Sequence, residues 1–187
     1  MKILIVSAST RTGRLTHQAA LGLHNHLKNH PEITSQLLDL KEVALPMFEE
    51  SYGKLSTPSD TISTVHEILN NADAYLFVSP EYNGSYSSAL KNMVDIYPKT
   101  TFANKAVGIV TISSGNLGGM RAAIQMQQLT LAVWAIPSPQ MLLVSNVKDK
   151  FNEEGDITDP SFVQQTTLFL NEFLWLAKAL KNARHPA

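Results

Sequence analysis

Apolar runs alternate with amphipathic segments along the whole chain. Runs rich in apolar and β-branched residues predict five strands, at 2–7, 33–40, 74–79, 105–112 and 140–144. Between them, apolar residues spaced like one face of a helix predict helices over about 14–29, from Pro58 past Leu69, and over about 86–96, 118–133 and 162–181. A stretch at 49–58 fits either a helix or a loop. Strands that alternate with helices in this way favour an α/β fold with a doubly wound parallel sheet.

Length and composition narrow the class of protein. The 187 residues, 44% of them hydrophobic and 17% charged, suit one globular domain, and neither a repeat nor a long linker divides 1–187. The formal net charge of -1 argues against a nucleic-acid binder, because such proteins usually carry a basic excess. Cysteine is absent, which excludes disulfides, thiolate metal sites and thiol nucleophiles. No apolar run approaches a membrane span, so we expect a cytoplasmic protein without membrane contact.

The loop after the first predicted strand has the composition of an anion site. Parallel sheets bind ligands beyond the carboxyl ends of their strands, which draws attention to the loops after the first, third and fourth. The first loop contributes the hydroxyls of Ser9 and Thr16 and the cations Arg11 and Arg14, at the start of a helix. Backbone N–H groups and the positive helix end attract phosphate there. The alternative is an ordinary strand-to-helix turn with arginines in solvent.

The loop after the third predicted strand begins with Pro80, which ends the strand. Tyr82 and Tyr86 offer flat surfaces for an aromatic ligand, and Gly84 permits unusual backbone angles. An ordinary hairpin turn would need a matching strand, and only a helix follows. A ligand-binding loop is therefore favoured over a bare connection.

The loop after the fourth predicted strand, 113–121, holds three glycines, namely Gly115, Gly118 and Gly119. Glycines let the main chain approach a ligand closely at a helix start. They serve close packing between helix and strand equally well, so this signal alone is weak.

Histidines gather near the end of the first predicted helix, where His26 and His30 have the spacing of a helical metal pair. No carboxylate completes a metal motif, and a solvated helix end is the better interpretation. We therefore predict no metal site.

Taken together, these loops resemble the NADPH-dependent FMN reductases of flavodoxin-like fold. The run 80–85, followed by 89–92 and Asp95, is similar to that family's most specific signature. Ser9, Arg11 and Thr16 resemble its phosphate loop, and 114–122 and 151–159 resemble two later stretches, so the likeness spans essentially the whole chain. One departure is Arg14, because many members carry serine at its position.

The resemblance implies a five-stranded parallel sheet in the order 2-1-3-4-5 with helices on both faces. It also implies an FMN cofactor and NADPH or NADH as hydride donor. The residues expected to hold FMN are Ser9, Arg11, Arg14, Thr16, Pro80, Glu81, Tyr82, Asn83, Gly84, Ser113, Ser114 and Gly115. No catalytic side chain is expected, because the flavin supplies the chemistry.

The predicted reaction passes hydride from NADPH to bound FMN and then electrons to a small acceptor, with ping-pong kinetics. Relatives reduce free flavin, quinones, azo compounds or metal oxyanions, and these acceptors stay open. We also expect backbone N–H groups at 114–116 and the start of the next helix to stabilise negative charge on reduced flavin. Apolar helix residues near the site, Met93, Ile96, Met120 and Ile124, suggest a homodimer or homotetramer. The alternative function is a flavodoxin-like electron carrier without NADPH turnover, although such carriers are usually strongly acidic.

Overall fold

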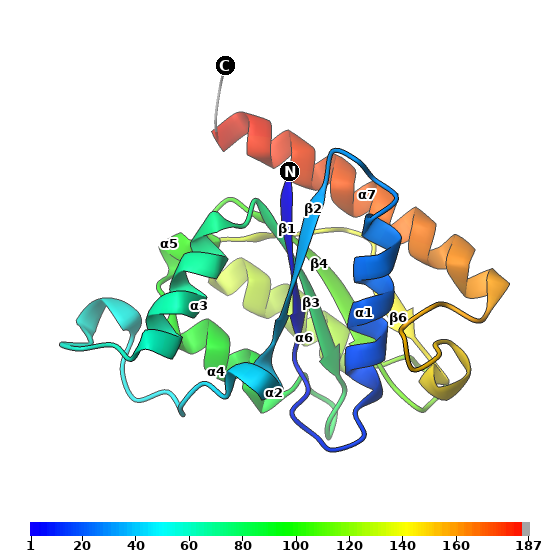
Figure 1. The fold of residues 1–187 in the computed structure, drawn as a ribbon, viewed down its shortest axis with the longest axis horizontal. Coiled ribbons are helices and arrows are strands. Elements are labelled where there is room, and N and C mark those ends of the chain that lie inside the picture. The colour runs from blue at the N-terminus through cyan, green and yellow to red at the C-terminus, as the bar shows by residue number, and fades with distance from the viewer. Residues whose placement is uncertain (185–187) are drawn as a thin grey trace.

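A single parallel sheet organises the protein in a computed structural model that describes residues 1–184 (Figure 1). The strands run in the order β2-β1-β3-β4-β5, and a short β6 also pairs with β4. Their bounds are β1 Lys2–Ser7, β2 Thr34–Asp39, β3 Ala74–Pro80, β4 Ala106–Ile112, β5 Ile136–Pro137 and β6 Leu142–Val144. The predicted doubly wound architecture and strand order are thus confirmed.

The last edge of the sheet differs from the predicted strand at 140–144. Two short strands share this edge, with Ile136 opposite Ala106 and Leu142 opposite Val110. Pro137 ends β5 and Pro139 lies between the two strands, and neither has an N–H to donate to the neighbouring strand. The Ser138 N–H still donates to the Val107 carbonyl of β4, after which the chain leaves β4 and rejoins it at Leu142.

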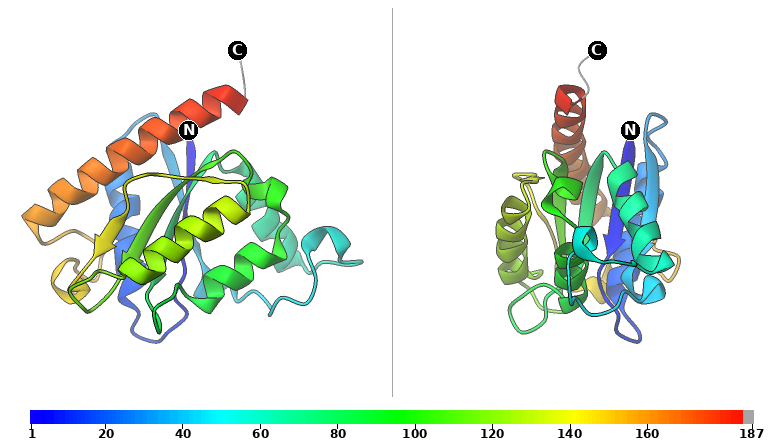
Figure 2. Two further views of the ribbon diagram at one scale, coloured as in Figure 1. Left: turned by 180° about the vertical axis from the view of Figure 1, so that it is seen from behind. Right: turned by 90° about the vertical axis from the view of Figure 1, so that its left-hand side faces the viewer.

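Helices cover both faces of the sheet (Figure 2). Residues of α3, α4 and α6 share one apolar core with the sheet, and residues of α1 and α7 share the other. The helices are α1 Leu15–Leu27, α2 Leu40–Val43, α3 Asp60–Asn71, α4 Ser88–Ile96, α5 Lys99–Phe102, α6 Met120–Ala132 and α7 Pro160–Arg184, with 3-10 turns at Tyr52–Lys54 and Val147–Asp149. The four-residue helices α2 and α5 were not predicted, because they are too short to show a period.

Successive side chains of the central strands point alternately into two apolar cores, one on each face of the sheet. Leu4 and Val6 of β1 belong to the core under α3, α4 and α6, whereas Ile3 and Ile5 belong to the core under α1 and α7. All four are buried. Burial on both faces explains why these strands are uninterrupted apolar runs in the sequence.

Gly108, in the middle of β4, allows α7 to pack closely against the sheet. A Cβ atom on Gly108 would lie 2.5 Å from Leu76 Cδ2 and 3.0 Å from Phe173 Cδ2. Both side chains are fully buried in the core formed with α7.

In residues 1–184, no helix has the length and apolar character required to cross a membrane.

Candidate functional site: a cavity at the carboxyl ends of the strands

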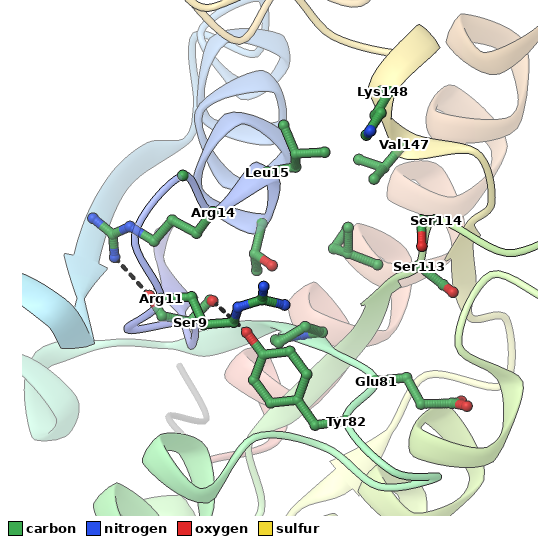
Figure 3. A pocket seen from close by; sticks show the side chains of 14 residues that line it. Ser9, Arg11, Arg14, Leu15, Glu81, Tyr82, Ser113, Ser114, Val147 and Lys148 are labelled. Atoms are coloured by element: carbon green, nitrogen blue, oxygen red, sulfur yellow. Dashed lines mark hydrogen bonds between the residues drawn. The ribbon is translucent and has the colours of Figure 1, made fainter.

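A cavity of about 320 Å³ opens where β1, β3 and β4 end (Figure 3). This volume lies in the usual range of small-molecule sites, about 300–1,000 Å³. The predicted site residues that line it are Ser9, Arg11, Arg14, Thr16, Pro80, Glu81, Tyr82, Ser113 and Ser114. Asn83, Gly84 and Gly115 do not line it, and their contacts with a cofactor stay predictions.

The first loop presents backbone donors that have no protein acceptor. In the described chain, the N–H groups of residues 10–13 donate to no protein acceptor. Helix α1 follows without a side-chain cap and without an acidic residue in its first turn. By contrast, Ser59 caps α3 and Ser87 caps α4. The amino-terminal end of α1 is therefore available to an anion.

Side chains around these donors are polar or cationic. Ser9 and Thr16 are almost fully buried at the cavity wall, and Arg11 is exposed with its guanidinium 5.8 Å from the centre of the Tyr82 ring. The Tyr82 hydroxyl forms a 2.9 Å hydrogen bond with Ser9 Oγ. The first and second loops thus meet across the cavity floor.

Arg14 contributes differently from the other predicted residues. Its guanidinium forms a bidentate ion pair with Asp39 at the end of β2, and one of its nitrogens also donates to the Ser9 carbonyl at 2.8 Å. In Figure 3 the guanidinium points away from the other labelled side chains, towards β2. Arg14 thus pairs with Asp39 at the cavity wall, and its expected contact with phosphate stays a prediction.

The Asp39 carboxylate also contacts groups other than Arg14. It caps α2 by accepting a hydrogen bond from the Lys41 N–H, and one of its oxygens lies 3.2 Å from His17 Nδ1. Burial alone would raise the pKa of Asp39, but hydrogen bonds from Arg14 and Lys41 and nearby positive charge hold it below its usual value. Burial is also the main reason that the pKa of His17 is lowered, and Asp39 opposes that shift.

The second loop folds as a tight two-residue turn. Tyr82 and Ser85 exchange two backbone hydrogen bonds around Asn83 and Gly84, whose φ angles are 51° and 80°. Positive φ at both central residues is typical of a type I′ turn. Gln125 of α6 binds its tip by donating to the Gly84 carbonyl at 2.8 Å. The Asn-Gly pair therefore forms a hairpin turn without long flanking strands, and it rests against α6 rather than in the cavity.

The third loop uses its last two glycines for packing. A Cβ on Gly118 would meet Leu143 at 2.9 Å, and one on Gly119 would meet Thr111 Cβ at 2.9 Å. Both residues have positive φ. Gly115 has no such neighbour, because its closest contact would be Ser113 Oγ at 3.5 Å. The packing interpretation is correct for Gly118 and Gly119.

The start of α6 is already occupied by a carboxylate. Glu81 Oε2 accepts the N–H groups of Arg121 and Ala122 at 3.1 and 3.2 Å. Two N–H groups of this helix end therefore already bind a protein carboxylate. The expectation that the N–H groups at 114–116 and this helix start stabilise reduced flavin stays a prediction.

Sequence reasoning missed five lining residues, namely Gly13, Leu15, Ile112, Val147 and Lys148. Lys148 is the most informative, because it adds a second exposed cation to the cavity. It follows β6, and only the loops after the first, third and fourth strands had been considered. The rule that ligands bind beyond the carboxyl ends of strands applies to this loop as well.

The histidines of α1 make other contacts. His24 Nδ1 lies 2.8 Å from Ser35 Oγ, and the His26 and His30 rings are 6.5 Å apart. Across residues 1–184, no group of three or more His, Asp or Glu side chains is placed to hold a metal ion.

Known proteins resemble this chain over most of its length. The sequence profile of the NADPH-dependent FMN reductase family matches residues 1–149. An NAD(P)H-dependent FMN reductase of Pseudomonas aeruginosa is 29% identical over 167 residues, which cover 85% of each chain. An FMN-dependent NADPH-azoreductase of Staphylococcus aureus is 28% identical over 184 residues, covering 93% of this chain and 94% of the relative.

A solved structure has the same fold. FerB, a flavoenzyme NAD(P)H:(acceptor) oxidoreductase of Paracoccus denitrificans, superimposes with a TM-score of 0.79 at 19% identity, covering 95% of this chain and 97% of that one. This likeness supports the flavodoxin-like fold. The family description names FMN, NADPH and reduction, so the predicted enzyme class and cofactors are confirmed at the level of the family. The chain belongs to the NADPH-dependent FMN reductase family.

Proposed function

We propose that this protein is an FMN-dependent NAD(P)H oxidoreductase that reduces a small acceptor. The observation that carries the proposal is the uncapped start of α1, where the N–H groups of residues 10–13 lack protein acceptors and Arg11 lies alongside. Phosphate is the anion that such an arrangement suits best.

The residues present fit FMN. Ser9, Arg11, Thr16 and the N–H groups of the first loop would hold the phosphate. The main chain of Pro80 to Tyr82 and of Ser113 and Ser114 would border the flavin ring. Contacts from Asn83, Gly84 and Gly115 belong to this proposal too, through the main chain of the same two loops.

Bound FMN would supply the redox chemistry, namely acceptance of hydride from NAD(P)H and delivery of electrons to the acceptor. The chain itself binds and orients the reactants. Among the lining residues, the side chains that carry an acidic or basic group are Arg11, Arg14, Glu81, Tyr82 and Lys148. Because Glu81 caps α6 and Arg14 pairs with Asp39, we assign no acid–base catalyst. NAD(P)H and the acceptor would use the open side of the cavity in turn, which predicts ping-pong kinetics.

The acceptor is a small molecule. Among the relatives, a protein of Pseudomonas putida is named quinone reductase and is 28% identical over 148 residues, and the Staphylococcus aureus protein is named an azoreductase. Together with the FMN reductase of Pseudomonas aeruginosa, these names support a quinone, an azo compound or free flavin as the acceptor. We propose a cytoplasmic location, in keeping with a cysteine-free chain.

The surface of α6 supports the proposed homo-oligomer, whereas Met93 and Ile96, which also suggested it, are buried in the core. Met120, Ile124 and Leu131 follow one another along this helix and are 39%, 47% and 60% exposed. Association of two copies through this face would remove apolar area from water beside the cavity. Light scattering on the eluting protein tests this, and a monomeric mass would remove the idea.

The visible spectrum of the purified protein tests the proposed function. The protein is first saturated with FMN, and NADPH is then added without oxygen. Loss of the flavin bands within the mixing time, followed by their return on addition of a quinone, is the expected result. FMN binding without bleaching would favour the electron carrier. Failure to bind FMN and to oxidise NADPH would refute the proposal.

A further inference from the structure

Asp39 and Arg14 act together on the backbone of the first loop. One guanidinium nitrogen of Arg14 contacts both the Asp39 carboxylate and the carbonyl oxygen of Ser9, the latter at 2.8 Å. The second nitrogen also binds Asp39. The two charged side chains are only 11% and 12% exposed, so this pair is largely shielded from water. Shielded, bidentate pairs fix geometry better than surface pairs do.

Fixing the Ser9 carbonyl also fixes the next N–H. The peptide bonds of the described chain are trans, so the carbonyl of Ser9 and the N–H of Thr10 point in opposite directions. Arg14 holds the carbonyl on the side of β2. The Thr10 N–H is thereby turned away from β2, and it is one of the loop donors without a protein acceptor. Thr10 itself lines a second cavity, whereas Ser9 and Arg11 on either side of it line the first.

We propose that the Arg14–Asp39 pair is a positioning device that fixes the Ser9–Thr10 peptide and thereby holds the first loop, with its free N–H groups, in place for the phosphate of FMN. Arg14 is then a positioning residue and not a phosphate ligand. This inference rests on the proposed function, because it concerns how the same site recognises its cofactor. It identifies Asp39, a residue outside the cavity lining, as a determinant of selectivity for phosphorylated flavin over riboflavin.

Simple electrostatics predicts the opposite result for the key variant. Replacing Asp39 with Asn removes a negative charge near a site for a phosphate dianion and frees Arg14, so charge alone would tighten FMN binding. The positioning role predicts weaker binding, because the Ser9–Thr10 peptide is no longer held. Whether Asp39→Asn tightens or weakens FMN binding therefore shows whether Arg14 acts by its charge or by positioning the loop.

The test compares FMN with riboflavin by calorimetry or by quenching of flavin fluorescence. At pH 8, a value above the lowered pKa of His17, we expect Asp39→Asn to weaken FMN binding by about tenfold or more, the worth of a charged hydrogen bond. Riboflavin lacks the phosphate, so its affinity should change much less. Glu42→Gln is the matched control, because Glu42 lies 3.9 Å from Arg14 but is 76% exposed and outside the bidentate pair. This control should leave both affinities near those of the unchanged protein.

Arg14→Lys provides a second variant should Asp39→Asn fold poorly. It keeps the positive charge but cannot reproduce the fork that reaches both Asp39 and Ser9, so it should lose FMN selectivity as well. Tighter or unchanged FMN binding in these variants would overturn the inference. An equal loss for FMN and riboflavin would also overturn it, since it would reveal a merely structural role. Failure of the unchanged protein to bind FMN would instead refute the proposed function, and this inference with it.

Discussion

The Glu81 carboxylate, directly after β3, accepts a hydrogen bond from the backbone N–H of Arg121, 3.1 Å away at the start of α6. The Ala122 N–H binds the same oxygen at 3.2 Å. One side chain thus joins the second loop to the helix that follows the third loop. The two walls of the cavity are coupled through this cap.

Replacement of Glu81 should therefore destabilise the protein. Glu81→Ala removes the cap of α6 and should lower the free energy of unfolding by about 0.5–2 kcal/mol. Glu81→Gln keeps an acceptor oxygen and should lose less. Chemical denaturation measures both, and Glu49→Ala, at an exposed glutamate far along the chain, is the control. Equal stability of the Ala variant and the control would contradict the capping role.

The glycines of the third loop should separate stability from cofactor binding. Gly119 has φ of 84° and no space for a Cβ beside Thr111, so Gly119→Ala should cost about 1–3 kcal/mol or more of folding free energy. Gly115 has neither constraint, and Gly115→Ala should leave the stability almost unchanged. Thermal melting of the FMN-free proteins makes the comparison. Similar losses for the two variants would contradict the packing interpretation.

A bulky residue at Gly115 tests a different property. Gly115→Leu should fold normally but weaken FMN binding or slow reduction by NADPH, because the third loop is proposed to border the flavin ring. Stopped-flow absorbance measures the reduction rate. Unchanged binding and reduction would remove Gly115 from the site.

Lys148 provides a prediction about charge. It is exposed at the cavity, and across residues 1–184 it makes no ion pair. Lys148→Gln should weaken FMN binding by about two- to fivefold, the scale of an exposed ion pair, and added salt should reduce this difference. Lys178→Gln on the exposed face of α7 is the control. A loss that salt leaves unchanged would argue against an electrostatic role.

Most of the fold follows from local pattern, because central strands buried on both faces are unmistakably apolar. The edge does not follow, since β5 and β6 together pair with a single strand and prolines interrupt them. Placing the fifth strand only at 140–144 hid the upstream segment Ile136–Pro137.

The site residues that lie close together in the sequence were predictable. Ser9, Arg11 and Thr16 lie within one loop, and the rule for parallel sheets places that loop at the cavity. The partner of Arg14 was not predictable, because Asp39 is separated from it by 25 residues and reaches it only through the pairing of β2 with β1. Long-range pairs of this kind decide which of two neighbouring arginines at the cavity has its guanidinium engaged by a carboxylate.

A buried lysine at the opposite end of the sheet predicts how stability depends on pH. Lys105 Nζ donates to the carbonyls of Leu69 and Asn70 at the end of α3, at 3.0 and 3.1 Å, and to the Tyr75 hydroxyl at 2.9 Å. Burial, aided by the charge of Arg184, lowers the pKa of Lys105 from 10.5 to about 8, although Asp73 opposes the shift. Burial raises the pKa of Tyr75, so that hydroxyl keeps its proton over the same range.

The direction in which stability changes with pH follows from which state, folded or unfolded, binds more protons. Below pH 8 the lysine is charged in both states, and the folded state bears the cost of burying that charge. Between about pH 8 and 10.5 the unfolded state binds the extra proton, so this group makes stability rise with pH, by at most about 1.4 kcal/mol per pH unit. Lys105→Met lacks the titration. The free energy of unfolding of the unchanged protein, minus that of Lys105→Met, should therefore increase from pH 8 to pH 10 in urea titrations. All other groups titrate in both proteins and cancel, so a difference that stays flat or falls with pH would show that Lys105 retains its ordinary pKa in the folded state.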